Sequence, residues 1–184
     1  MRLSKGIHLP SLIALTVVCY CIFFYGLGHY PLWDPDEGRV GEIAKEMVAS
    51  GNWVTLTHNG LPYYDKPAPY FWLLALGIKL LGLNELAVRL PSALAAGLTI
   101  GLVYLWGCVS GGWKRGLWGG LVLATSIEFA ALGRFAKMDM LFTFFFSAAL
   151  FCFLWWRKHG STRRSIWAFY LALALASLTK GPAG

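Results

Sequence analysis

The residues best suited to chemistry gather in one acidic stretch of an otherwise apolar chain. Five of the nine acidic residues fall within thirteen positions, directly after a hydrophobic run long enough to cross a bilayer; they are Asp34, Asp36, Glu37, Glu42 and Glu46. A carboxylate at a membrane surface can serve as general base toward an acceptor hydroxyl or phosphate. The pattern therefore predicts a reaction centre facing a lipid-borne substrate, with Asp36, beside Trp33, as its base.

An amphipathic helix is expected to carry these acids. Its apolar positions recur with helical spacing, at Val40, Ile43, Ala44, Met47 and Val48. Asp34 suits the N-cap, Glu37 the matching position of a capping box, and Gly51 the C-terminal stop. Asp34 and Glu37 thus have a structural alternative to catalysis, and it leaves Asp36 unused. The helix is predicted to lie on the membrane, its apolar face toward lipid or toward the spans.

A second external stretch holds Asp65 and Lys66 between prolines that leave the backbone little freedom. A lysine ammonium is a compact charge suited to neutralising a phosphate oxygen, so Lys66 is predicted to bind phosphate. Asp65 can orient Lys66, or ligate a metal ion together with His58. The alternative is a solvated ion pair in a loop. A divalent metal ion is the one candidate cofactor that these residues suggest.

Further charged residues flank the later apolar runs on the same side. Arg134, Lys137 and Asp139 lie between the third and fourth runs, and Lys180 ends the fifth. A charge at bilayer depth costs about 2.5–3.5 kcal/mol on insertion scales, so these groups are expected near the interface, paired with acids or an anionic ligand. Lys180 has the simpler alternative of snorkelling to the interface. Together these residues would supply a base for an acceptor and positive charge for a departing phosphate.

The elements that must position these residues are membrane-spanning helices. Hydrophobic residues make up 57% of the 184 and charged residues 14%, against roughly one quarter charged in a soluble domain. Five nearly uncharged runs approach the length of a span: 7–28, 91–110, 117–133, 140–156 and 166–179. The sequence therefore predicts an all-α, polytopic transmembrane bundle with an external loop over 29–69. A re-entrant or interfacial helix is expected over 70–83.

The formal net charge of +7 follows membrane topology rather than a nucleic-acid surface. Basic residues fill the N-terminus and the loops after the second and fourth runs, at Arg2, Lys5, Lys114, Arg115, Arg157, Lys158, Arg163 and Arg164. The positive-inside rule makes that side cytoplasmic, so the acidic stretch faces outward. Membrane lipids are expected partners, and nucleic acid is not.

Five motifs, in this order, resemble the N-terminal region of GT-C type glycosyltransferases, in the family 39 branch of protein O-mannosyltransferases and the lipid A aminoarabinose transferase. They are Trp-Asp-Pro-Asp-Glu-Gly-Arg at 33–39, Asn-Gly-Leu-Pro-Tyr-Tyr-Asp-Lys-Pro-Ala-Pro at 59–69, Ala-Val-Arg-Leu-Pro-Ser-Ala at 87–93, Arg-Phe-Ala-Lys-Met-Asp at 134–139 and Thr-Lys-Gly-Pro at 179–182. The resemblance is specific for this branch and unspecific for the substrate.

The resemblance implies a multispanning enzyme of the bacterial inner membrane with a cytoplasmic N-terminus. Such an enzyme transfers a sugar, with inversion, from a polyprenyl-phosphate donor to a lipid, protein or glycan acceptor on the extracytoplasmic face. The family's catalytic acid matches Asp36, with Glu37 beside it, and its phosphate-binding lysine matches Lys180. Its acid after the third span matches Asp139. The family's Glu-Lys-Pro-Pro motif, in the donor-phosphate and metal region, here has the shorter Asp65 and lacks the second proline.

Members of this family usually run to several hundred residues, with more spans and a soluble C-terminal domain. This chain is therefore expected to be a truncated N-terminal module, residues 1–184, that is inactive alone. Two rival interpretations stay open. One is a transporter or lipid-handling protein whose charges line a pathway, and the other is an inactive fragment of the enzyme.

Overall fold

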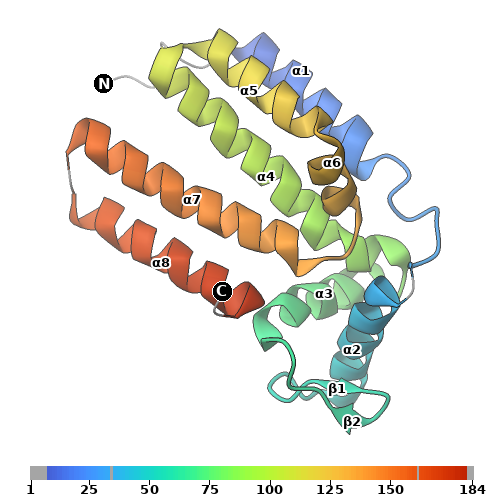
Figure 1. Ribbon diagram of the computed structural model, residues 1–184. Helices are drawn as coiled ribbons and strands as arrows, with labels where there is room; N and C mark the ends of the chain where they lie inside the picture. The colour runs from blue at the N-terminus through green and yellow to red at the C-terminus, as the bar shows by residue number, and fades with distance from the viewer. Residues whose placement is uncertain (1–7, 34, 161, 182–184) are drawn as a thin grey trace.

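The computed structural model describes residues 8–33, 35–160 and 162–181, and this part of the chain is mostly helical. Five helices lie side by side along the bundle in the order α1, α5, α4, α7 and α8 (Figure 1). Their bounds are Leu9–Cys19 for α1, Trp113–Thr125 for α5, Glu85–Gly111 for α4, Met138–His159 for α7 and Arg163–Lys180 for α8. The predicted all-α membrane bundle is confirmed.

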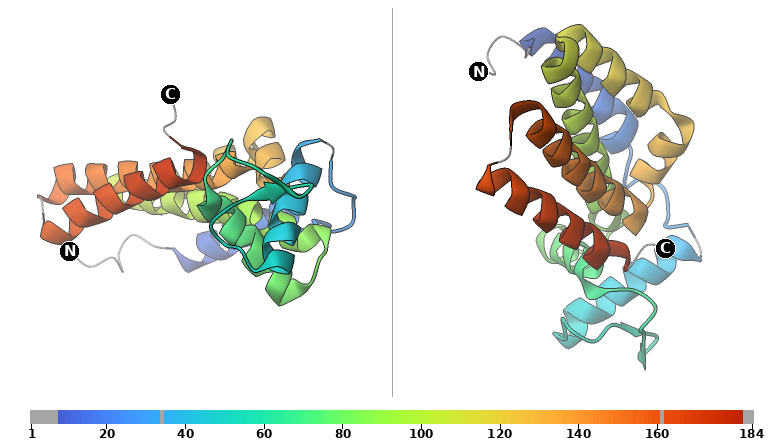
Figure 2. Two further views of the ribbon diagram at one scale, coloured as in Figure 1. Left: turned by 90° about the horizontal axis from the view of Figure 1, so that it is seen from below. Right: turned by 60° about the vertical axis from the view of Figure 1, so that its left-hand side comes forward.

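The remaining elements gather at one end of this bundle, as the views in Figures 1 and 2 agree. They are helix α2 (Asp36–Ser50), helix α3 (Ala68–Leu81) and a short antiparallel hairpin of β1 (Thr57–His58) and β2 (Leu61–Pro62). A π-helical turn, η2 (Tyr20–Phe24), extends α1, and α6 (Ile127–Arg134) follows α5. This end of the molecule carries the acidic stretch.

Length and composition qualify α4 and α7 as membrane spans within the described residues. The α5–α6 pair qualifies as a third if its two bent parts are counted together. The helix formed by α1 and η2 and helix α3 are apolar but shorter. The five predicted runs therefore correspond to helices, while the number of crossings stays a prediction.

The apolar run predicted as a span over 117–133 forms two helices, because the helix breaks at Ser126. Helices α5 and α6 meet there at 69°, and Ser126 adopts an extended backbone conformation. The hydroxyl of Thr125 donates to the carbonyl oxygen of Leu121 at 2.8 Å. Such back-bonding by serine or threonine favours bending of a helix.

Helix α4 begins earlier than predicted, with Pro91 inside it rather than at its start. Its N-cap is Asn84, whose side-chain oxygen accepts from the Ala87 N–H at 2.8 Å. Pro91 has no N–H, so the carbonyl of Ala87 lacks its usual helical donor. Helix α3 approaches at this point through Gly77, where an added Cβ would lie 2.7 Å from that carbonyl oxygen. The close contact fixes α3 against α4.

Helix α2 forms as the periodicity predicts, and its apolar face turns toward the bundle rather than toward lipid. Ile43, Ala44 and Met47 are buried in the core that α2 shares with α3 and α4. The helix ends at Gly51, which has the left-handed φ of 70° expected of a C-terminal stop.

The start of α2 differs from the predicted capping box. The helix begins at Asp36, after Pro35, which makes no side-chain capping bond. Asp34, the predicted cap, lies outside the described residues. The Glu37 carboxylate accepts from the Trp33 N–H at 2.9 Å, one of several bonds that draw it into the interior. This contact orients the acidic stretch.

The predicted turn at Asn59 and Gly60 is confirmed. Both residues have positive φ, 53° and 74°, as a two-residue hairpin turn between β1 and β2 requires. The Gly60 N–H donates to Glu46 of α2 at 3.2 Å, and the Tyr63 N–H donates to the Leu56 carbonyl at 2.8 Å. These bonds hold the chain that carries residues 63–66 against α2.

Candidate active site

A cavity of about 200 Å³ opens where four separate segments meet at the α2 end of the bundle. Helix α2, the loop before α3, the link between α6 and α7 and the end of α8 each contribute to its lining. Its polar lining residues are Asp36, Arg39, Tyr63, Asp65, Lys66, Lys137, Asp139 and Lys180. Six of these are predicted site residues, and the fold brings them into one cavity.

Three ion pairs surround this cavity. The ammonium of Lys137 lies 3.4 Å from Asp36, that of Lys66 lies 3.4 Å from Asp65, and that of Lys180 lies 2.5 Å from Asp139. The first joins α2 to the α6–α7 link, and the third joins α7 to α8. More than a third of each side chain is exposed, so each pair contributes little to stability. Such pairs can exchange partners when an anion enters.

Tyr63 supplies a neutral donor at the rim of the cavity. Its hydroxyl donates to Asp65 at 3.1 Å. Burial and the Asp65 carboxylate raise the pKa of Tyr63 above its ordinary value, and nearby Arg39 opposes that rise without cancelling it. The phenol is therefore protonated at neutral pH and able to donate a hydrogen bond.

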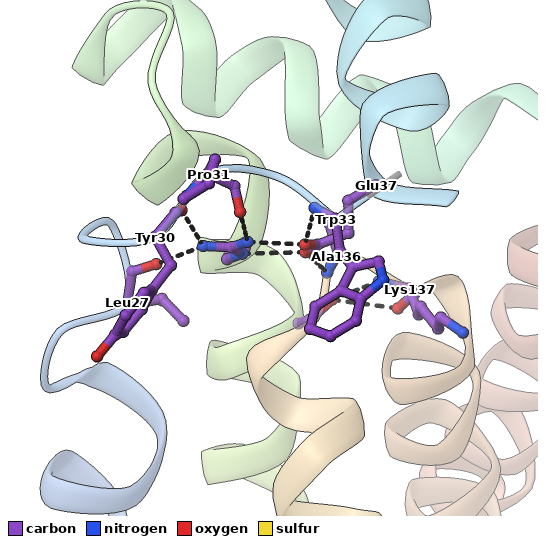
Figure 3. A network of polar contacts seen from close by, with 9 residues as sticks. Leu27, Tyr30, Pro31, Trp33, Glu37, Ala136 and Lys137 are labelled. Carbon is purple, nitrogen blue, oxygen red and sulfur yellow. Dashed lines mark hydrogen bonds and ion pairs between the residues drawn. The ribbon is translucent and has the colours of Figure 1, made fainter. Parts of the chain in front are cut away.

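A buried ion pair between Glu37 and Arg89 lies beneath the cavity. Both oxygens of Glu37 bind the guanidinium, at 3.0 Å to Nε and 2.7 Å to Nη2. The remaining N–H groups of Arg89 donate to backbone carbonyls of Leu27, Tyr30 and Pro31, at 2.8–3.0 Å. Figure 3 shows these carbonyls on one side of the network and Glu37 on the other. All five guanidinium N–H groups are used.

The Glu37 carboxylate also binds the backbone of the α6–α7 link, residues 135–137. Glu37 accepts from the Ala136 N–H at 2.7 Å, next to Lys137 (Figure 3). Ser92 of α4 adds two bonds to the backbone of Lys137, donating to its carbonyl at 3.1 Å and accepting from its N–H at 3.3 Å. The backbone that carries Lys137 and Asp139 is thereby tied to α2 and α4.

Glu37 is 1% exposed and does not line the cavity. Burial alone would raise its pKa, but the bonds from Arg89, Ala136 and Trp33 hold the pKa of Glu37 below its ordinary value. Its four acceptor positions are occupied by Arg89 twice, Ala136 and Trp33. This geometry suits an anchor that positions Asp36, rather than the catalytic acid predicted from the sequence.

Arg134 also lies away from the cavity. Its guanidinium donates to the carbonyls of Ile22 and Tyr25 at 2.6 and 3.1 Å, where the first apolar helix ends. A cation at a helix C-terminus is stabilised by the carbonyls that point there. Arg134 therefore satisfies the end of η2 instead of supporting the site with Lys137.

The candidate metal ligands His58 and Asp65 do not gather a third ligand in the described part of the chain. No group of three His, Cys, Asp or Glu side chains with metal-binding proximity occurs there. The ring of His58 packs edge-on against Tyr63, with centroids 6.4 Å apart. Asp65 is engaged by Tyr63 and Lys66.

The family of this chain follows from a match over nearly its whole length. The family model described as dolichyl-phosphate-mannose-protein mannosyltransferase matches residues 10–184. The chain belongs to this family. Membership agrees with the order of the five motifs and with an integral membrane bundle.

Two curated proteins are similar to this chain over most of its length. An uncharacterized protein of Aquifex aeolicus is 38% identical over 96% of this chain and 35% of its own length. The undecaprenyl phosphate-alpha-4-amino-4-deoxy-L-arabinose arabinosyl transferase of Aeromonas hydrophila is 34% identical over 88% of this chain and 31% of its own length.

A solved structure shares the fold as well. ArnT from Cupriavidus metallidurans, bound to undecaprenyl phosphate, superposes with a TM-score of 0.87 and 31% identity, over 93% of this chain and 32% of that one. The chain thus spans about one third of the length of the relatives it matches.

Three residues of this site escaped sequence reasoning. Arg39 lies three positions after Asp36, a spacing that places both on one face of a helix and would have indicated it. Tyr63 lies two positions before Asp65, on the same extended stretch. Arg89 offered a weaker signal, as one charge at the border of an apolar run, and nothing local pointed to Glu37 as its partner.

Removing one member of the buried pair should destabilise the protein strongly. Arg89→Met leaves the Glu37 carboxylate buried without its cation, which costs about 3–5 kcal/mol in comparable pairs. We expect a sharply lower temperature of aggregation for the detergent-purified full-length protein. The double variant Glu37→Leu with Arg89→Met should recover part of that loss, because it leaves no buried charge.

The matched control is Lys45→Met, which breaks the exposed Glu42–Lys45 pair on α2. Equal losses for Arg89→Met and Lys45→Met would contradict the anchoring role.

Acid should weaken the fold through the same carboxylate. Because the pKa of Glu37 is lower in the folded state than its ordinary value of 4.5, the unfolded chain binds a proton first as pH falls. The stability due to Glu37 is therefore complete above that ordinary value and lost as pH drops below it toward the folded-state pKa. Thermal stability measured from pH 7 to pH 3 should decline less in the Glu37→Leu/Arg89→Met double variant. A parallel decline in both proteins would rule out this contribution.

Proposed function

We propose that the protein is a membrane glycosyltransferase that moves a sugar from a polyprenyl-phosphate donor to a lipid, protein or glycan acceptor. The observation that carries the proposal is the single cavity in which Asp36 meets Lys66, Lys137 and Lys180. A base and several phosphate-neutralising cations are what this transfer needs. The names of the relatives, which include arabinosyl transferases acting with undecaprenyl phosphate, support the same donor class.

Asp36 is the group best placed to act as base. It is the exposed acid of the first turn of α2, whereas its neighbour Glu37 is saturated by hydrogen bonds. In the reaction, the acceptor hydroxyl oxygen attacks the anomeric carbon as Asp36 takes its proton, and the bond from that carbon to the phosphate oxygen breaks. Attack from the face opposite the phosphate inverts the anomeric configuration.

The lysines supply the other half of the chemistry. Lys66 and Lys180 lie on different elements, and each forms a partly exposed ion pair with a carboxylate. Because such a pair is weak, either ammonium can turn toward a phosphate while the backbone stays in place. Positive charge at the departing oxygen stabilises the negative charge that develops there in the transition state. The proposed roles are donor-phosphate binding for Lys66 and Lys180, with support from Asp65, Asp139 and Lys137.

The proposed site faces the extracytoplasmic side of a bacterial inner membrane, with the N-terminus in the cytoplasm. Support comes from charge at the two ends of the bundle. The described basic residues of the two predicted cytoplasmic loops are exposed at the ends of α4, α5, α7 and α8 that lie away from the cavity. Lys158 donates to the Val109 carbonyl there, so the α7 and α4 ends meet. The positive-inside rule assigns that end to the cytoplasm.

Replacing the base should abolish sugar transfer. Asp36→Asn in the full-length protein keeps the size of the side chain but removes its proton affinity. We expect turnover to fall by about a hundredfold to ten-thousandfold, the usual contribution of general acid–base catalysis. The assay follows transfer of aminoarabinose from its undecaprenyl-phosphate donor to lipid A, and of mannose to protein, by mass spectrometry.

The control for this substitution is Glu42→Gln, which removes an acid from the same helix outside the cavity. Full transfer by Asp36→Asn would refute the proposed base. If neither the native protein nor any variant yields a glycosylated product while lipid still moves across the membrane, the protein is a transporter instead.

Neutralising a phosphate-binding lysine should weaken donor use. Lys180→Gln is expected to lower kcat/KM for the donor by about tenfold to a thousandfold, since a stabilising charge at the leaving group is lost. Lys180→Arg should retain part of the activity. Lys45→Gln, an exposed lysine of α2 outside the cavity, is the matched control. Unchanged kinetics for Lys180→Gln would contradict phosphate binding by Lys180 and favour the alternative that its side chain only extends to the membrane interface.

A further inference from the structure

The cavity has a charge balance that distinguishes two kinds of phosphate ester. Among the described residues that line it, the cations outnumber the carboxylates by one: Arg39, Lys66, Lys137 and Lys180 face Asp36, Asp65 and Asp139. The Glu37–Arg89 pair below is neutral as a unit. With Asp36 ionised, the described lining residues therefore carry one net positive charge.

The two phosphates of the proposed reaction differ by up to one charge. A sugar linked to a polyprenyl phosphate is a phosphodiester, which carries a single negative charge at neutral pH. The polyprenyl phosphate left after transfer is a monoester, which carries roughly 1.5 to 2 negative charges because its second pKa lies near 6. One net positive charge balances the charge of the first of these, whereas the second leaves up to one negative charge uncompensated.

We infer that proton transfer to Asp36 shifts the relative affinity of the cavity from the phosphodiester donor toward the phosphomonoester product. This inference rests on the proposed function. During transfer the acceptor oxygen bonds to the anomeric carbon, its proton passes to Asp36, and the electron pair of the broken carbon–oxygen bond stays on the phosphate. The cavity gains one positive charge as the phosphate gains one negative charge.

The ion pair between Asp36 and Lys137 links the charge of Asp36 to phosphate binding. The two side chains lie 3.4 Å apart and come from different elements, α2 and the α6–α7 link. A proton on Asp36 removes the partner of Lys137, so the ammonium is free to bind the phosphomonoester. Loss of that proton restores the Asp36–Lys137 pair and weakens the hold on the product. Release of the lipid phosphate is thereby coupled to release of the proton.

The test compares two lipids that differ in charge and by a single methyl group. The probes are undecaprenyl phosphate and its methyl ester, each titrated in detergent into the purified full-length protein. Asp36→Asn removes the charge that protonation would remove, and the Coulomb energy gained scales with the charge of the ligand. We expect the ratio of the methyl-ester Kd to the phosphate Kd to rise about tenfold in Asp36→Asn, with Glu42→Gln unchanged.

A double variant separates net charge from local packing. Asp36→Asn with Lys137→Gln returns the cavity to one net positive charge, so its Kd ratio should return close to that of the native protein. A ratio unmoved by Asp36→Asn, or one that stays raised in the double variant, overturns the inference.

Failure of the inference can be told apart from failure of the proposed function. If Asp36→Asn abolishes transfer and leaves the Kd ratio unchanged, the result supports Asp36 as the base and refutes the coupling between its charge and phosphate binding. If Asp36→Asn transfers sugar at the native rate, the proposed function falls whatever the binding data show.

Discussion

The buried ion pair of Glu37 and Arg89 is the interaction on which the rest of this end of the molecule depends. A guanidinium inside an apolar helix is stable only where every N–H finds an acceptor, and here Glu37 and three backbone carbonyls supply them. The chain between η2 and α2, the start of α2, helix α4 and the α6–α7 link are all joined through these two side chains. Their relative positions, and so the width of the cavity above, are set by one network.

The cavity above this network is built from interactions of the opposite kind. Its three ion pairs are partly exposed, and each contributes little to stability. Rigid backbone below and exchangeable side chains above suit a site that must bind an anion and then release it. A cavity lined by pairs as strongly held as Glu37 and Arg89 would have no cation available for a phosphate.

Local patterns in the sequence were enough to predict what depends on neighbours in the chain. The apolar spacing of α2, the stop at Gly51 and the turn at Asn59 and Gly60 each follow from a few adjacent residues. Basic loops at alternate ends of the runs placed Asp36, Lys66, Asp139 and Lys180 on one side, and the fold brings them together. The pairing of Glu37 with Arg89 joins residues 52 apart, and the orientation of Arg134 depends on carbonyls more than a hundred residues away. Neither contact leaves a local trace, and the break at Ser126 falls within a stretch whose overall length and composition resemble those of one span.

The different tasks proposed for Asp36 and Glu37 explain why the first turn of α2 holds two adjacent acids. Consecutive residues of a helix point about 100° apart, so Asp36 can face the cavity while Glu37 faces the core. If one carboxylate had to serve as both base and anchor, every proton it accepted would release Arg89 and loosen the α6–α7 link. Because the tasks are divided, a proton on Asp36 disturbs only the exposed contact with Lys137 and leaves the Arg89 network charged. Protonation of the proposed base can therefore change the charge of the site without changing its shape.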